Sequence, residues 1–189
     1  TLKGEGGADY IDGGADNDSI YGGADDDSIY GGSGDDTLSG EAGKDTLRGG
    51  THTITTGLEG SGDPLSGKGD TASYSYLDTG TNKIVVNLAS NSNQAIVYDG
   101  STASTTDIDQ LIDIENINGT KNDDTMTGNS ANNSLIGNAG NDLFYGSEGS
   151  DTIDGGTGAT VDIANYSTLG QKIILTTTDD GTTSTYTVL

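Results

Sequence analysis

Residues 13–21 read Gly-Gly-Ala-Asp-Asn-Asp-Ser-Ile-Tyr, and this nine-residue pattern recurs without a break from Gly4 to Arg48. Position one of each unit is Gly, position six is Asp, and position eight is Ile or Leu. Self-similarity at a fixed period is typical of stacked units that bury their apolar side chains only against one another. The apolar positions of this first array are Ile11, Ile20, Ile29, Leu38 and Leu47.

Each unit combines a turn with a short strand. The first six positions are rich in Gly, Asp, Asn and Ala, which suit a tight turn because Gly, and less readily Asn or Asp, adopts positive φ. Positions seven to nine place one apolar residue between two outward-facing residues, which predicts a three-residue strand. Two units complete a coil, so equivalent residues of successive coils are eighteen apart. The predicted fold class is all-β, built from parallel β-rolls.

The composition is strongly acidic, with 30 Asp and Glu against 7 Lys and Arg and a net charge of −23. This charge argues against nucleic acid as a partner. Only 30% of the residues are hydrophobic and 32 are Gly, values that would indicate disorder in a chain without repeats. A salt-adapted acidic surface would not need Asp at one fixed position of a repeat. The pattern therefore favours a hard cation with oxygen ligands.

Calcium fits this pattern best. It accepts six to eight oxygens in flexible geometry, whereas magnesium keeps its waters and requires an octahedron. Zinc and copper prefer His or Cys, and the chain has one His and no Cys. Carboxylates one coil apart, such as Asp18 and Asp36, can share an ion. The predicted ligands in the first array are Asp9, Asp18, Asp27, Asp36 and Asp45 at position six, Asp16 and Asp25 at position four, and the turn residues Gly13, Gly22, Gly31, Gly34 and Gly40.

The repeat Gly-Gly-x-Gly-x-Asp-x-aliphatic-x resembles the calcium-binding nonapeptide of the repeats-in-toxin (RTX) family. The resemblance covers about half of the chain. It implies a parallel β-roll with calcium between successive turns, in large proteins that Gram-negative bacteria export by type I secretion. Because Leu2 falls on position eight of an earlier unit, we expect the chain to be a fragment of a longer protein.

The register is lost after Gly50. Residues 51–66 are predicted to form a surface loop, which holds the lone His52. The pattern resumes at Asp70, which we expect to pair with Asp36 as a further metal ligand. Two β-branched runs within residues 83–99 predict an antiparallel hairpin that caps the first roll. The first domain is therefore predicted to span residues 1–100.

A second array occupies residues 107–189, the second predicted domain. Its position-six residues include Asp124, Asp142 and Asp151, which we predict as metal ligands. Asn133 carries no charge, so we expect the site that it shares with Asp151 to be weakened. After a break that mirrors the first, Asp162 is expected to pair with Asp142. A second capping hairpin is predicted over residues 172–189.

The leading functional hypothesis is a calcium-dependent structural module of a large secreted or surface protein. It would be unfolded where calcium is scarce and would fold outside the cell. The alternatives are an appendage of a secreted lipase, protease or polysaccharide-modifying enzyme, and a surface-layer or adhesin segment with outward Tyr residues. We expect no enzymatic activity, because the chain has no Gly-x-Ser-x-Gly, no His-rich zinc motif and no Cys. It also has no apolar run long enough for a membrane helix and no signal peptide at its start.

Overall fold

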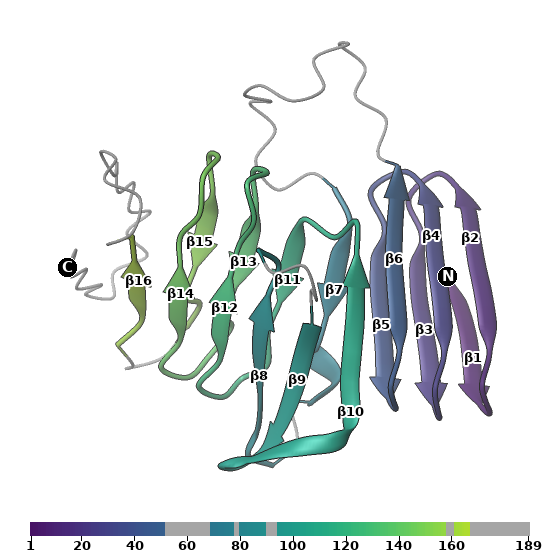
Figure 1. Cartoon of the computed structure of the whole chain (residues 1–189), viewed down its shortest axis with the longest axis horizontal. Helices are drawn as coiled ribbons and strands as arrows, with labels where there is room; N and C mark the ends of the chain where they lie inside the picture. Colours follow the sequence, from purple (N-terminus) through teal and green to yellow (C-terminus); the bar gives the residue numbers. More distant parts are fainter. Residues whose placement is uncertain (52–68, 78–79, 90–93, 158–160, 167–189) are drawn as a thin grey trace.

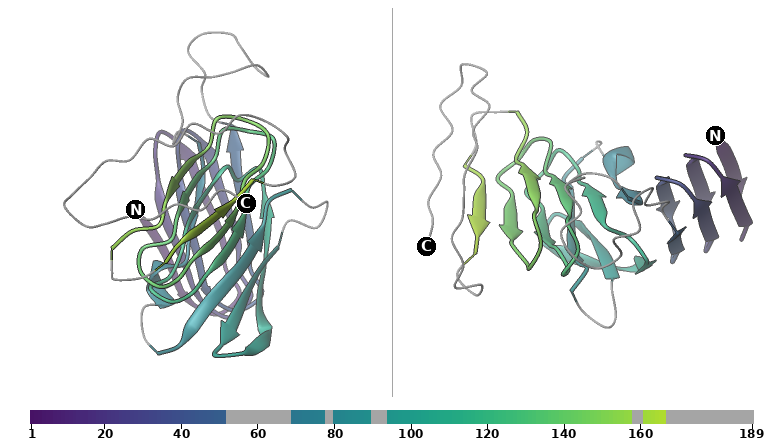
Figure 2. Two further views of the ribbon diagram at one scale, coloured as in Figure 1. Left: turned by 90° about the vertical axis from the view of Figure 1, so that its left-hand side faces the viewer. Right: turned by 90° about the horizontal axis from the view of Figure 1, so that it is seen from above.

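The computed structural model describes residues 1–51, 69–77, 80–89, 94–157 and 161–166. Over these residues the chain is built from strands and turns, apart from one 3₁₀ turn at Ser75–Leu77 (η1). The strands wind into a stack of coils with one sheet on each side (Figures 1 and 2). The predicted all-β fold with parallel stacked coils is confirmed.

The first array contributes six strands, which alternate between the two sheets. Strands eighteen residues apart pair in parallel and in register, so that Ile11 lies beside Ile29 and Leu2 beside Ile20. Pairing continues past position nine, as between Gly14 and Gly32, so these strands are longer than the three residues predicted. The strands are β1 (Leu2–Gly6), β2 (Tyr10–Ala15), β3 (Ser19–Ala24), β4 (Ser28–Ser33), β5 (Thr37–Ala42) and β6 (Thr46–Thr51).

The second array has the shorter strands that the pattern predicts, each covering positions seven to nine. They are β11 (Asn116–Asn118), β12 (Thr125–Thr127), β13 (Ser134–Ile136), β14 (Leu143–Tyr145), β15 (Thr152–Asp154) and β16 (Ile163–Asn165). Between the arrays lie β7 (Thr71–Ser73), β8 (Asn82–Asn87), β9 (Gln94–Asp99) and β10 (Thr102–Ile112).

Two sheets run through both arrays. Within the described residues, one sheet has seven parallel strands in the order β1-β3-β5-β7-β11-β13-β15. The other has nine strands in the order β2-β4-β6-β10-β9-β8-β12-β14-β16. Strand β10 is parallel to β6, β9 is antiparallel to both β10 and β8, and β8 is parallel to β12. The hairpin therefore lies inside the sheet (Figure 1).

The predicted position of the first hairpin, as a cap over the end of a roll, is wrong. The hairpin itself is confirmed, but it is bonded through β10 to the first array and through β8 to the second. Its apolar face, which includes Ile84, Val86 and Val97, is buried in the core. A strand pair with one buried face and two open edges is stabilised most where both edges find partners.

Several predictions lie outside the described residues. These are the loop with His52 predicted over residues 51–66, apart from Thr51, which ends β6, and the hairpin predicted over residues 172–189. The division of the chain into domains 1–100 and 107–189 stays a prediction, although the hydrogen bonds of both sheets continue across it.

The core is one side chain thick. Ile20, Ile29, Leu38 and Leu47 are at most 1% exposed between the two sheets of the first array. Ile117, Met126, Leu135 and Phe144 continue the same line in the second array. Where the register breaks, the fully buried Tyr74 fills the space and its hydroxyl donates to Asp109 Oδ2 at 2.9 Å. Because this line of buried side chains is narrow, the turns are the other part of the fold where stabilising interactions are expected.

Candidate functional site

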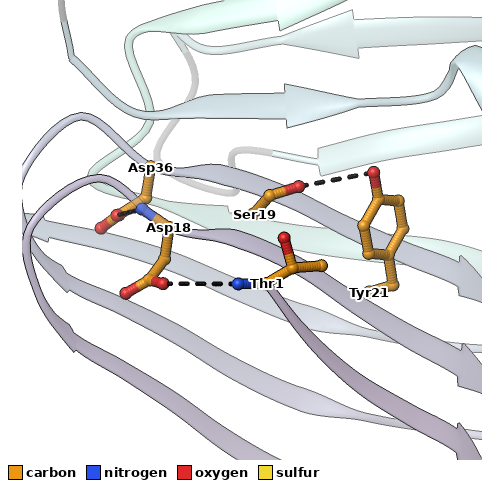
Figure 3. Close-up of polar contacts among 5 residues, drawn as sticks. All are labelled: Thr1, Asp18, Ser19, Tyr21 and Asp36. Carbon is orange, nitrogen blue, oxygen red and sulfur yellow. Dashed lines mark hydrogen bonds and ion pairs between the residues drawn. The ribbon is translucent and has the colours of Figure 1, made fainter.

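The position-six carboxylates form rows along the stack. The backbone N–H of Asp9 donates to Asp27 Oδ1 at 2.8 Å, and that of Asp27 donates to Asp45 Oδ1 at 2.9 Å. On the opposite edge, the N–H of Asp18 donates to Asp36 Oδ1 at 2.8 Å (Figure 3). The structure thus brings together the pairs that the eighteen-residue spacing predicts.

Each row continues beyond the first array. We define the first row as the residues that precede strands of the nine-stranded sheet, together with Asp109 within β10, and the second row as those that precede strands of the seven-stranded sheet. A backbone N–H donates to the next side chain of the row at 2.9 Å from Asp36 to Asp70, 2.9 Å from Asp124 to Asp142 and 3.0 Å from Asp142 to Asp162. The first row is interrupted between Asp109 and Asp124, where Asp124 Oδ1 accepts the Ile84 N–H instead. The first row contains Asp9, Asp27, Asp45, Asp109, Asp124, Asp142 and Asp162, and the second contains Asp18, Asp36, Asp70, Glu115, Asn133 and Asp151.

Asp109 was missed by the sequence analysis. The Asp45 N–H donates to Asp109 Oδ1 at 3.2 Å, across 64 residues of sequence. Burial, followed by the charge of Asp45, raises the pKa of Asp109 to about 8. Asp109 lies in the long strand β10 and not in a Gly-rich turn, so the nonapeptide pattern holds no signal for it.

The second carboxylate oxygen, Oδ2, of several position-six Asp residues has no hydrogen-bond partner in the protein. Asp27, Asp36, Asp45 and Asp142 are each at most 3% exposed. Their Oδ2 atoms, and that of Asp9, are buried and accept no hydrogen bond from the protein. A buried carboxylate oxygen with no partner is costly unless a cation approaches it. These unbonded oxygens therefore indicate that a cation binds at the turns.

The pKa shifts of these carboxyl groups also indicate that a cation is needed at the turns. Burial raises the pKa of Asp27 and of Asp36, and it raises the pKa of Asp45 to about 6 and that of Asp142 to about 7. Neighbouring carboxylates add to each of these shifts, as Asp124 and Asp162 do at Asp142. Ionisation of each group is therefore less favourable than that of an exposed carboxyl, and a bound cation would favour it.

Glycine at position one makes room for the carboxylate. A Cβ at Gly31 would fall on Asp36 Oδ2 and would lie 2.7 Å from the Gly49 carbonyl oxygen. A Cβ at Gly4 would lie 2.5 Å from both Asp9 Oδ2 and the Gly22 carbonyl oxygen of the next coil. Carboxylate and carbonyl oxygens thus converge above Gly4, Gly13, Gly22 and Gly31. At the predicted residue Gly40, a Cβ would meet the carboxylate of Asp45.

Position four plays a different part. Asp16, Asp25 and Gly34 have φ of 73°, 79° and 138°, so they shape the turn through left-handed backbone. The side chains of Asp16 and Asp25 are exposed, and Asp25 Oδ2 accepts the Gly7 N–H at 3.2 Å. The structure places these two predicted ligands at the rim and not among the buried carboxylates.

The donor set identifies the kind of ion. In the part of the chain that the structure describes, no three His, Cys, Asp or Glu side chains come together. A cation would be held by one or two carboxylates together with main-chain carbonyl oxygens. Calcium accepts such a mixed oxygen set, whereas a structural zinc site requires four closely placed Cys or His ligands. The residues present fit calcium.

The comparison with protein families agrees with this geometry. Four copies of the RTX calcium-binding nonapeptide repeat match residues 1–29, 21–51, 113–144 and 127–161. The chain belongs to the RTX repeat family. A comparison with curated proteins gave no match. The matched repeat is a calcium-binding one, and the two matched regions correspond to the two arrays. No described helix is long and apolar enough to cross a membrane.

Replacing Gly31 with Ala is expected to impair calcium binding and to destabilise the calcium-loaded RTX roll by about 1–3 kcal/mol, because the methyl group overpacks the space beside Asp36 Oδ2. Gly6→Ala is the matched control, since a Cβ there meets nothing within 4 Å. Calcium titrations followed by circular dichroism measure both variants. Equal midpoints for Gly31→Ala and Gly6→Ala would contradict the assignment of this space to the ion.

Proposed function

We propose that this chain is a calcium-dependent structural module of a larger secreted or cell-surface bacterial protein, and that it has no catalytic role. The observation that carries the proposal is the set of position-six carboxylates whose buried Oδ2 accepts no hydrogen bond from the protein, namely Asp9, Asp27, Asp36, Asp45 and Asp142. Calcium bound between successive turns would supply the missing partner. Asp9, Asp27, Asp36 and Asp45 would hold ions in the first array, and Asp142 in the second.

The energetics support folding on calcium binding. The chain has a net charge of −23 and a core one side chain thick, so the ion-free roll concentrates negative charge without much apolar burial. With dissociation constants of about 10⁻⁴–10⁻³ M, as in extracellular modules, each site contributes about 0.4–1.4 kcal/mol at 1 mM calcium. Ions shared along a row add these contributions, which makes the transition steep.

This dependence suits an exported protein. Where calcium is scarce, as inside the producing cell, the acidic chain would stay unfolded and could pass through a narrow secretion channel. Outside, millimolar calcium would neutralise the facing carboxylates and fold the roll. The RTX repeats support this proposal, since the family is typical of secreted bacterial proteins.

The test is a titration of the chelator-treated chain with calcium, followed by far-ultraviolet circular dichroism. We expect a cooperative gain of β-sheet signal at about 0.1–1 mM calcium. Magnesium at the same concentrations should have little effect, because it dehydrates reluctantly and requires a regular octahedron. A chain that is fully folded in chelator, or that responds equally to magnesium, would overturn the proposal.

A further inference from the structure

The turns of the two arrays differ at position two. In the first array the position-two residues Glu5, Gly14, Gly23, Gly32 and Glu41 all have positive φ, between 68° and 120°. In the second array, Asn138 and Gly156 are also left-handed, with φ of 74° and 89°. Thr120, Asn129 and Ser147 occupy the same position but are not among the described residues with positive φ. We call turns with left-handed position two open turns, and the other three closed turns.

In each closed turn, position two donates to the position-six side chain of the same turn. The Thr120 N–H donates to Asp124 Oδ2 at 2.7 Å, and the Thr120 hydroxyl lies 3.0 Å from Oδ1. The Asn129 N–H donates to Asn133 Oδ1 at 2.8 Å. Equivalent bonds from the N–H and hydroxyl of Ser147 reach Asp151 Oδ2 at 3.4 and 3.2 Å.

The other polar atoms of these side chains are bonded as well. Asp124 Oδ1 accepts the Ile84 N–H at 2.8 Å, and Asp151 Oδ1 accepts the Asn133 N–H at 3.1 Å. Asn133 Nδ2 donates to the Glu115 carbonyl at 2.7 Å. A closed turn therefore satisfies its position-six side chain from within the protein.

The open turn at residues 137–142 shows that the backbone conformation at position two matters more than the array. It lies between two closed turns, yet Asp142 Oδ2 is buried and unbonded, as in the first array. Its position-two residue is the left-handed Asn138, whose side chain donates instead to Asn118 Oδ1 and to the Gly119 carbonyl, at 2.9 and 2.8 Å. Thr and Ser favour local hydrogen bonds in turns, whereas Gly tolerates left-handed backbone. Asn can do either: Asn138 is left-handed, while Asn129 Oδ1 accepts the Ala131 N–H of its own turn at 2.9 Å.

We infer that the closed turns fold without calcium, so that the backbone conformation at position two decides which turns of this chain take an ion. The inference rests on the proposed function, because it divides the calcium dependence unequally between the arrays. The predicted ligands Asp124 and Asp151 are then internal hydrogen-bond acceptors. Residues 119–136 form a calcium-independent part of the stack, against which the calcium-dependent coils assemble.

Hydrogen exchange on the full chain, with calcium or with chelator, tests this division. We expect peptides within residues 119–136 to keep their protection in chelator, and peptides within residues 13–42 to lose it. If neither region responds to calcium, the proposed function fails. If the first array responds and residues 119–136 lose protection to the same extent, the inference alone fails.

A pair of substitutions in one turn sharpens the test. Ser147→Gly removes the hydroxyl and permits left-handed backbone, so protection of residues 147–154 in chelator should fall about fivefold to tenfold, as for the loss of one hydrogen bond. Calcium should restore part of it. Ser150→Gly is the control, because Ser150 is exposed and its N–H, which donates to Asn132 Oδ1, is retained. Equal effects of the two variants, or no effect of Ser147→Gly, would overturn the role of position two.

Discussion

Asp36→Asn is expected to stabilise the roll in chelator and to destabilise it in calcium. Without calcium, the variant removes a buried negative charge whose Oδ2 has no partner, while its Oδ1 can still accept the Asp18 N–H. With calcium, it replaces a charged ligand that lies between Asp18 and Asp70 and so serves two sites. At 1 mM calcium the loss should be about 0.8–2.8 kcal/mol, twice the contribution of one extracellular-type site. Urea unfolding at 1 mM calcium measures the loss, and the far-ultraviolet circular dichroism signal in chelator measures the gain in folded fraction.

The control for this change is Asp35→Asn, which alters the charge by the same amount one residue away. Asp35 is only half-buried, and its Oδ1 accepts the Gly69 N–H at 3.2 Å. We expect a small effect that has the same sign with and without calcium. If Asp36→Asn destabilised the chain equally in chelator and in calcium, the carboxylate would be structural and not an ion ligand.

The pH dependence of stability is expected to reverse when calcium is added. Burial raises the pKa of Asp45 to about 6 and that of Asp142 to about 7, from an ordinary value of 3.8. A carboxyl group with a raised folded-state pKa contributes stability that is present below pH 3.8 and is lost as the pH rises through 6 to 7. In chelator, the folded fraction should therefore fall as the pH rises from 5 to 7.5. With calcium it should rise, because the ion binds only the deprotonated carboxylates.

The double variant Asp45→Asn/Asp142→Asn provides the control for this prediction. It removes two of the titrating groups, so the pH dependence in chelator should become shallower, while the general repulsion of the acidic chain is nearly unchanged. Asp109, whose pKa burial raises to about 8, retains part of the dependence. Thermal unfolding at several pH values, in chelator and in calcium, gives the comparison. Stability of the chelated wild-type chain that increases with pH over this window would contradict the assignment.

The first array shows what local pattern can predict. Because the nine-residue period is unbroken, a coil of two units follows directly, and with it the pairing of Asp18 with Asp36 and of Ile11 with Ile29. The position-one glycines were also predicted as part of the turns. Only the structure shows why glycine is needed there: a carboxylate oxygen occupies the place that a Cβ would take.

In the middle of the chain, the sequence pattern did not predict how the segments pair. The β-branched runs predicted a hairpin correctly, but its place was decided by which sheet edges were open to it. Asp109 and Tyr74 meet beside Asp45 because β10 pairs with β6, and no period in the sequence relates these segments. A single sequence carries no signal for contacts across 64 residues between segments that do not repeat.

By itself, the sequence determined the coil, its register and the rows of acidic turns, because a strict repeat offers every unit the same neighbours one coil away. Only the tertiary structure decided that the hairpin joins the two arrays within one sheet, and that Thr120, Asn129 and Ser147 close their turns by hydrogen bonds. The physical reason is that open edges and buried polar atoms must find partners, and which partners lie within reach depends on how the whole chain is stacked.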